Sequence, residues 1–125
     1  DYMKDFSQKV LNNEIKLHEF DRLSNEEIVD VLTTVKGIGV WTAQMFLIFT
    51  LEREDVLAVQ DVGLHRGAKW LYGGENGKEI LLKKAKNWSP YETIASLYLW
   101  EVVNSGTILK YKTFDEFYRA YISNV

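Results

Sequence analysis

One carboxylate, that of Asp61, occupies a position in the sequence that is suited to catalysis. Asp61 follows the apolar residues 56–59, and helical periodicity resumes after it at Leu64, Ala68 and Leu71. We therefore expect this acid at a helix N-terminus, where the positive end of the helix dipole favours the ionised form. An ionised carboxylate can stabilise a cationic transition state, or orient and deprotonate a water molecule. The position suits an aspartate that merely caps the helix equally well, and the two roles are compatible.

A glycine-rich turn precedes this acid in the chain. Gly37 and Gly39 flank Ile38, and two glycines so close together permit positive φ and a tight reversal. The helix after the turn would begin with free backbone N–H groups near Gly39 and Val40. Such groups suit a phosphate oxygen, and Lys36 adds positive charge nearby. An ordinary turn between two packed helices explains the glycines equally well.

Two basic side chains follow the acid on the first turn of its helix. Arg66 is a candidate for contact with a phosphate, and solvated surface is the alternative. For His65 we expect a surface position and no role as a ligand. The two histidines, His18 and His65, are too few to build a zinc site alone, and the chain has no cysteine to help them.

The elements that must position these residues are helical throughout. Ser24 and Glu27 form a capping-box pattern that predicts a helix over about 24–34. Residues 40–51 are apolar nearly all round, which predicts a buried central helix. A first helix is expected over about 2–12. Later helix starts are predicted at Asn76, at Ser89 with Pro90 in the first helical position, and at Thr113.

These elements predict an all-α fold of about seven helices, because no segment shows sustained two-residue alternation. A chain of 125 residues fits a single helical domain over 1–125. Within it we expect two helices joined by the glycine hairpin at about 24–51, the acid and its following helix at 56–72, and C-terminal helices over 76–123.

Composition excludes several classes of protein. The absence of cysteine rules out disulfides, iron–sulfur clusters and thiolate zinc sites. No signal peptide and no run of ~18 apolar residues is present, so we expect a cytoplasmic protein without a membrane partner. The formal charge of −3 does not by itself suggest nucleic acid. It is uneven, however: residues 1–30 carry −4 and residues 31–125 carry +1.

The glycine turn and the acid together resemble a known family. Residues 32–43 (LTTVKGIGVWTA), followed by Asp61, are similar to the helix-hairpin-helix DNA glycosylases, and within them to the 3-methyladenine DNA glycosylase II branch. Residues 88–100 (WSPYETIASLYLW) resemble a late helix of that branch. Two motifs in order, over nearly the full chain, make the resemblance specific.

The resemblance implies a monofunctional glycosylase that hydrolyses the N-glycosidic bond of alkylated purines in double-stranded DNA, with no cofactor. The family flips the damaged nucleotide out of the stack, and the acid matching Asp61 assists cleavage by water. Members that also cut the backbone carry a nucleophilic lysine where Trp41 stands here. Trp41 would lie beside the pocket and offer an electron-rich face to a cationic base; core packing is the alternative.

For the DNA backbone, the resemblance implies contacts from the hairpin and from the helix after Asp61. The expected contact residues are Lys36, Gly37, Gly39, Val40, Thr42 and Arg66. No metal is expected on side chains, but backbone carbonyls near Lys36 to Gly39 are a candidate site for a monovalent cation.

The sequence departs from the family pattern in three places. Val59 and Gln60 replace the glycine or proline that often precedes the acid, and Glu92 and Glu101 replace basic residues of the late helix. Family members also have further N-terminal helices before a segment like 2–11, which complete the pocket. The resemblance therefore covers a C-terminal part. An inactive fragment, a non-enzymatic helix-hairpin-helix module that binds DNA, and a helical interaction protein are the alternatives.

Overall fold

The computed structural model describes residues 2–12 and 14–123, and every regular element in these ranges is helical. The prediction of an all-α fold is confirmed. The chain divides into two compact units, Asp1–Val56 and Leu57–Val125. Each unit is described by itself, and the prediction of one domain over 1–125 stays a prediction. None of the helices in the described ranges combines the length and apolarity needed to cross a bilayer.

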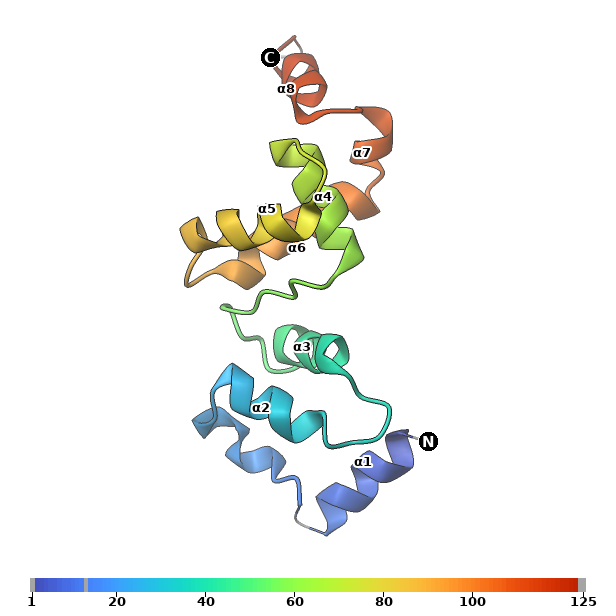
Figure 1. Ribbon diagram of the computed structural model, residues 1–125, viewed down its shortest axis with the longest axis vertical. Coiled ribbons are helices and arrows are strands. Elements are labelled where there is room, and N and C mark those ends of the chain that lie inside the picture. Colours follow the sequence, from blue (N-terminus) through green and yellow to red (C-terminus); the bar gives the residue numbers. More distant parts are fainter. Residues whose placement is uncertain (1, 13, 124–125) are drawn as a thin grey trace. The chain divides into compact units, whose positions relative to one another are not determined.

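In its described residues, the first unit contains three α-helices and a 3-10 helix (Figure 1). In chain order they are α1 (Tyr2–Leu11), η1 (Leu17–Arg22), α2 (Asn25–Leu32) and α3 (Val40–Phe49). The capping box predicted at the start of α2 is confirmed. Glu27 N donates to Ser24 Oγ, and Ser24 N donates to Glu27 Oε1, both at 3.1 Å. The unit buries one set of aliphatic and aromatic side chains: Ile15, Phe20, Ile28, Leu32, Val35, Ala43, Leu47, Ile48 and Val56.

Arg53 ties the end of this unit back to its beginning. Its Nη2 donates to the carbonyls of Phe20 at 2.8 Å and Leu23 at 3.1 Å, and its Nη1 donates to Asn25 Oδ1 at 3.1 Å. The planar guanidinium serves these acceptors at once, which an ammonium group could not do in one plane. The segment after α3 is thereby attached to η1 and to the start of α2.

The second unit contains the remaining elements. They are α4 (Val62–Tyr72), α5 (Gly77–Lys84), η2 (Ala85–Asn87), α6 (Glu92–Asn104), α7 (Thr107–Lys110) and α8 (Phe114–Ser123). The predicted starts at Asn76 and Thr113 are confirmed, since Asn76 Oδ1 accepts Glu79 N and Thr113 Oγ1 accepts Glu116 N, both at 3.1 Å. Figure 1 shows α5 and α6 lying against α4.

Close packing between α4 and α6 depends on a residue without a side chain. A Cβ placed on Gly67 would lie 3.2 Å from both Cβ and O of Leu99. Gly67 and Leu99 are both buried, so the two helices approach at this point almost backbone to backbone. This approach brings Trp100, the residue after Leu99, toward the first turn of α4.

Three predictions about the helices need correction. The helix predicted to start at Ser89 begins at Glu92 with Tyr91 as its N-cap and no side-chain cap, while the Ser89–Pro90 bond is cis. Tyr91 N donates to Trp88 O at 2.7 Å, which closes a turn directly before the helix. The backbone just before Glu92 therefore has the conformation of this turn and not that of a helix. The count of about seven also omitted the short elements η1, η2 and α7, whose periodicity is too brief to detect.

The third correction concerns α3, which is not buried on all sides. Ala43, Leu47 and Ile48 form its buried face, whereas Val40 is 52% exposed and Phe49 62% exposed. Apolar composition alone could not reveal this asymmetry, because the exposed side chains are as hydrophobic as the buried ones.

Candidate active site

Asp61 is the N-cap of α4, as predicted from the sequence. Its Oδ2 accepts the backbone N–H of Leu64 at 2.9 Å, which satisfies one of the donors that the start of a helix leaves without an intrahelical partner. The carboxylate thus lies in the positive field of the helix N-terminus. The side chain is neither sealed in the core nor fully exposed.

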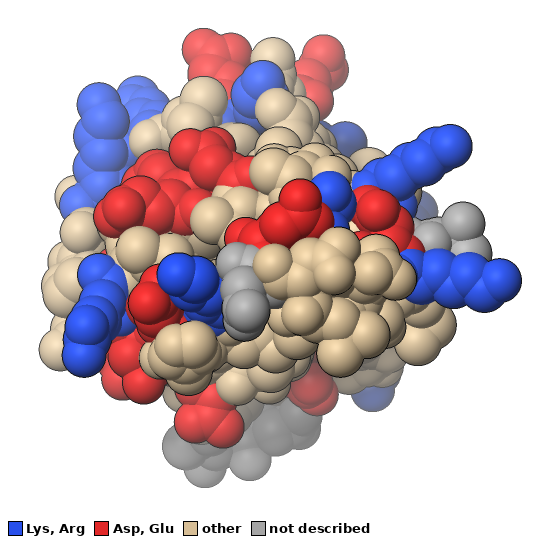
Figure 2. Space-filling view, turned by 90° about the horizontal axis from the view of Figure 1, so that it is seen from below, with Lys and Arg blue, Asp and Glu red and all other residues tan. Residues whose placement is uncertain are grey.

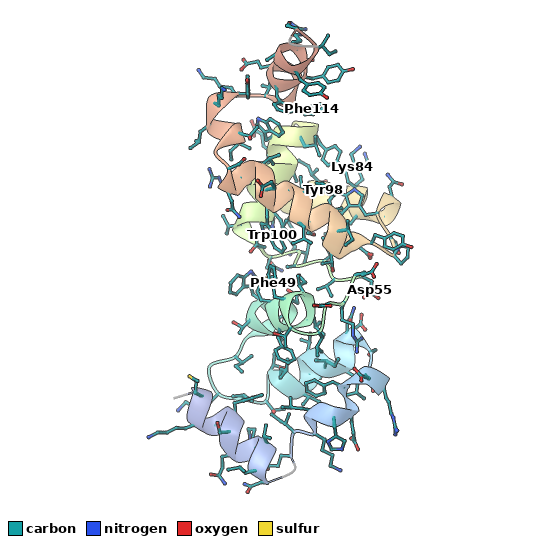
Figure 3. The ribbon with its side chains drawn as sticks, turned by 180° about the vertical axis from the view of Figure 1, so that it is seen from behind. Phe49, Asp55, Lys84, Tyr98, Trp100 and Phe114 are labelled. Carbon is teal, nitrogen blue, oxygen red and sulfur yellow. The ribbon has the colours of Figure 1, made fainter. Side chains whose placement is uncertain are left out.

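The same oxygen receives a second hydrogen bond from α6. Trp100 Nε1 donates to Asp61 Oδ2 at 2.8 Å, and Figure 3 shows Trp100 on α6 close to the beginning of α4. Two N–H donors on one oxygen fix the plane of the carboxylate and favour its charged form. The arrangement holds the carboxylate in one orientation.

Gly63 leaves the space in which these two side chains meet. A Cβ on Gly63 would lie 3.1 Å from Asp61 Oδ2, 3.4 Å from Trp100 Cδ1 and 3.5 Å from Trp100 Nε1. A side chain there would crowd both partners of the hydrogen bond. Sequence reasoning identified the acid but missed both Gly63 and Trp100. The only available signal for Trp100 was its place in the late-helix motif.

His65 occupies a different place from the one expected. We predicted a surface position, but its ring is half-buried and its Nε2 lies 2.6 Å from the carbonyl oxygen of Val59. The prediction was wrong because a histidine in the first turn of a helix can reach back to the segment that leads into that helix. Arg66, the next residue, is exposed on α4.

The hairpin turn lies in the first unit, between α2 and α3. Gly37 has φ 95°, which confirms the need for glycine at the reversal, whereas Gly39 has φ −93° and is extended. Gly39 is the N-cap of α3, it offers no side-chain cap, and a Cβ on it would meet nothing within 4 Å. The first turn of α3 is therefore open to an outside group that accepts hydrogen bonds.

Around the hairpin, an acid and an apolar pocket were not anticipated. Lys36 N donates to Asp5 Oδ2 at 2.8 Å, so a carboxylate of α1 already holds the start of the turn. Ile38 and Thr42 line an apolar pocket of about 240 Å³, together with Met3, Phe6, Ser7, Leu32, Ala43 and Phe46. Ile38 thus turns toward the body of its unit, although it is only half-buried.

Trp41 is not a core residue. It follows Val40 on the first turn of α3 and is 49% exposed, which excludes the interpretation of full core packing. Trp41 and the hairpin belong to the first unit, and Asp61 and Arg66 belong to the second.

Charge differs strongly between the two units. Residues 1–56 hold eleven acids and six Lys or Arg, a balance of −5, while residues 57–125 hold seven acids and nine Lys or Arg, a balance of +2; these sum to the chain's −3. The face drawn in Figure 2 carries acidic side chains near its middle and most of its Lys and Arg toward the edges. In the described part of the chain, no three acidic or histidine side chains gather into a metal-binding group.

Comparison with curated proteins finds relatives in DNA repair. No protein-family model matches the chain. The chain is 41% identical over 85 residues to "DNA-3-methyladenine glycosylase 1" of Schizosaccharomyces pombe. The matched region covers 66% of this chain and 37% of that protein. The chain spans less than half the length of the curated relatives it matches, from 35% to 46%.

Solved structures of this kind have the same fold. A DNA-3-methyladenine glycosidase from Bacillus halodurans superposes with a TM-score of 0.87 at 42% identity, over 94% of this chain and 55% of that one. The Schizosaccharomyces pombe 3-methyladenine DNA glycosylase (Mag1), in complex with abasic DNA, gives a TM-score of 0.75 at 36% identity, over 83% of this chain and 52% of that one. The chain is therefore related in sequence and fold to part of the DNA-3-methyladenine glycosylases.

Proposed function

We propose that this chain is the C-terminal, catalytic-side part of a monofunctional DNA glycosylase that removes alkylated purines such as 3-methyladenine from double-stranded DNA. The observation that carries the proposal is the orientation of the Asp61 carboxylate. A single carboxylate is oriented by two N–H donors at the N-terminus of α4, in a chain whose relatives are named 3-methyladenine glycosylases.

Asp61 is the proposed catalytic residue. Alkylation gives the purine a positive charge and makes it a good leaving group. As the bond to the base lengthens, positive charge develops on the deoxyribose, and an ionised carboxylate nearby stabilises it. A water molecule then adds to the sugar, the base leaves with the bonding electron pair, and Asp61 orients that water or accepts its proton.

Trp41 supports the monofunctional form of the reaction. An indole has no amine with which to attack the sugar and form a Schiff base, so water is the nucleophile. The exposed ring of Trp41 is proposed to face the flipped cationic base, where the electron-rich surface of the indole is attractive. Assignment to the glycosylase II branch in particular stays a prediction of the sequence resemblance.

The hairpin is the proposed contact with the DNA backbone. The uncapped first turn of α3 and the open space at Gly39 suit one phosphate oxygen. Lys36, Gly37, Val40 and Thr42 are proposed to contribute at this turn, and Arg66 on α4 at a further phosphate. A monovalent cation on the carbonyls of residues 36–39 stays a prediction, and the Gly39 carbonyl already accepts Ala43 N at 3.1 Å.

Further N-terminal helices of the same protein are proposed to complete the pocket, because the relatives extend well beyond the matched region. A second candidate function is a helix-hairpin-helix module that binds DNA without chemistry, which the open hairpin alone would support. The two functions differ in whether the Asp61 carboxylate is needed for anything beyond capping α4.

Incubation with methylated duplex DNA tests the proposal. The chain and the longest natural form of the protein are treated in parallel, and the released bases are separated by chromatography. We expect free 3-methyladenine or 7-methylguanine above the level without protein. Binding of the DNA without release by either form would favour the non-enzymatic module. Absence of DNA binding even at low salt would overturn both, since contacts to phosphates are strongest there.

A further inference from the structure

His65 joins the first turn of α4 to the segment that leads into it. Its Nε2 lies 2.6 Å from the carbonyl oxygen of Val59, two residues before Asp61, while His65 itself is four residues after Asp61. The hydrogen bond therefore closes a ring of seven residues, 59–65, with the carboxylate-bearing residue inside it. Asp61 O also accepts His65 N at 3.1 Å.

The segment before Asp61 has little regular structure of its own. Val59 N donates to Leu57 O at 3.0 Å and Asp61 N donates to Ala58 O at 2.9 Å, so it is a series of tight turns. Ala58 is fully buried and anchors one point of this segment. The histidine ring supplies a second anchor, one residue further along the chain.

The position of His65 is itself fixed from the other side by the start of α5. A Cβ on Gly77 would lie 2.5 Å from His65 Cβ and 2.7 Å from both Cα and O of His65. The backbone of α5 therefore packs directly on the backbone and Cβ of His65.

We propose that His65 is a positioning residue for Asp61: by binding the Val59 carbonyl it fixes the turn that presents the Asp61 carboxylate. This inference rests on the catalytic role proposed for Asp61. His65 touches neither substrate nor reacting atoms. It acts by holding the backbone on both sides of the acid. This matters because a small displacement of a reacting group strongly lowers the rate of reaction within the enzyme–substrate complex.

A matched pair of amide variants tests the inference. In His65→Gln the side-chain Nε2 has about the reach of the imidazole Nε2, so it can still donate to Val59 O. In His65→Asn the amide is one methylene shorter and cannot. Both variants keep a polar, uncharged side chain at the half-buried position, and thermal melts establish that each is folded.

The first readout does not require enzymatic activity. The indole N–H of Trp100 reports the place of Asp61, because it donates to Asp61 Oδ2; its ¹H–¹⁵N signal is assigned by its loss in Trp100→Phe. We expect this signal to shift or broaden in His65→Asn and to stay near the wild-type position in His65→Gln. An unchanged Trp100 signal in folded His65→Asn would overturn the inference.

The second readout is single-turnover base release by the longest natural form, measured beside DNA affinity. We expect His65→Asn to be slower by about 10-fold, which corresponds to roughly one lost hydrogen bond, with DNA affinity unchanged and with rescue by His65→Gln. Equal rates in the two variants would contradict the inference. If no form releases bases, the proposed function fails, while the Trp100 signal still decides whether His65 positions Asp61. Should His65→Asn not fold, His65→Leu, which also lacks the donor, takes its place in both readouts.

Discussion

Trp100 Nε1 donates to Asp61 Oδ2 at 2.8 Å, across 39 residues of sequence. The same oxygen accepts Leu64 N at 2.9 Å, three residues away. The carboxylate is thus oriented by a local bond, which caps the start of α4, and by a long-range bond, which forms because α4 and α6 pack closely. The long-range bond can be removed while the local cap remains.

Trp100→Phe removes the indole donor and keeps an aromatic ring in its place. A hydrogen bond to a charged group contributes about 1.5–3 kcal/mol, so we expect single-turnover base release to fall by roughly 10- to 100-fold. DNA affinity should change much less, because the bond does not involve phosphate. The rate and the dissociation constant are measured on methylated duplex DNA.

Trp70→Phe is the matched control for that variant. Trp70 Nε1 donates to Tyr111 O at 2.7 Å, and the ring packs against Phe114 and Phe117 of α8. The substitution also removes an indole N–H donor, but one that serves a backbone carbonyl and does not contact the acid. We expect a lower melting temperature and an unchanged rate of base release. Equal losses of rate in the two variants would mean that Trp100 matters only for packing.

Gly63→Ala separates stability from orientation. Alanine in a helix is favoured over glycine by about 0.5–1 kcal/mol, but the added Cβ would lie 3.1 Å from Asp61 Oδ2. We expect the melting temperature to hold or rise while base release falls by about 10-fold, a loss of roughly 1.4 kcal/mol. Calorimetry and the release assay measure the two effects. A wild-type rate would show that the crowding is relieved without moving Asp61 or Trp100.

Gly39→Asp and Gly39→Asn test the hairpin as a phosphate contact. Space is open at this position, and both side chains are good N-caps for α3, so we expect similar gains in stability. The aspartate additionally places a negative charge where a phosphate is proposed to bind. DNA affinity of Gly39→Asp should be weaker than that of Gly39→Asn by roughly 10-fold at low salt, with a smaller difference at high salt. Equal affinities would place the phosphate elsewhere.

Local features of the fold could be read from the sequence. The capping box at Ser24 and the caps at Asp61 and Asn76 were predictable because each involves a side chain and a backbone group three residues apart. The positive φ at Gly37 follows from the same local logic.

Contacts between distant segments could not be predicted in this way. The bond from Trp100 to Asp61 depends on how closely α6 approaches α4, which is set by Gly67 and Leu99 rather than by any pattern around the acid. The histidine at 65 gave a similar difficulty, because its partner Val59 lies in an irregular segment that has no periodicity. The acid and the local bond that caps its helix could thus be predicted from the sequence, whereas the long-range bond from Trp100 could not.

Arg53→Lys tests the structural support of the hairpin. The lysine ammonium cannot serve the Phe20 and Leu23 carbonyls and the Asn25 side chain together. We expect a loss of about 1–3 kcal/mol in the free energy of unfolding, from part-buried acceptors left without a donor. Denaturant titration measures it. An unchanged midpoint would mean that water replaces the guanidinium at no cost.

Asp61→Asn tests the central claim most directly, since asparagine caps a helix about as well as aspartate and can retain the Trp100 bond through its carbonyl oxygen. The measurement is single-turnover release of methylated bases by wild type and variant, in the longest natural form, beside DNA affinity and melting temperature. We predict that release falls by at least about 100-fold, a change of roughly 2.7 kcal/mol in the barrier, while folding is kept and DNA affinity is kept or increased. Wild-type release by a folded Asp61→Asn variant would contradict the account.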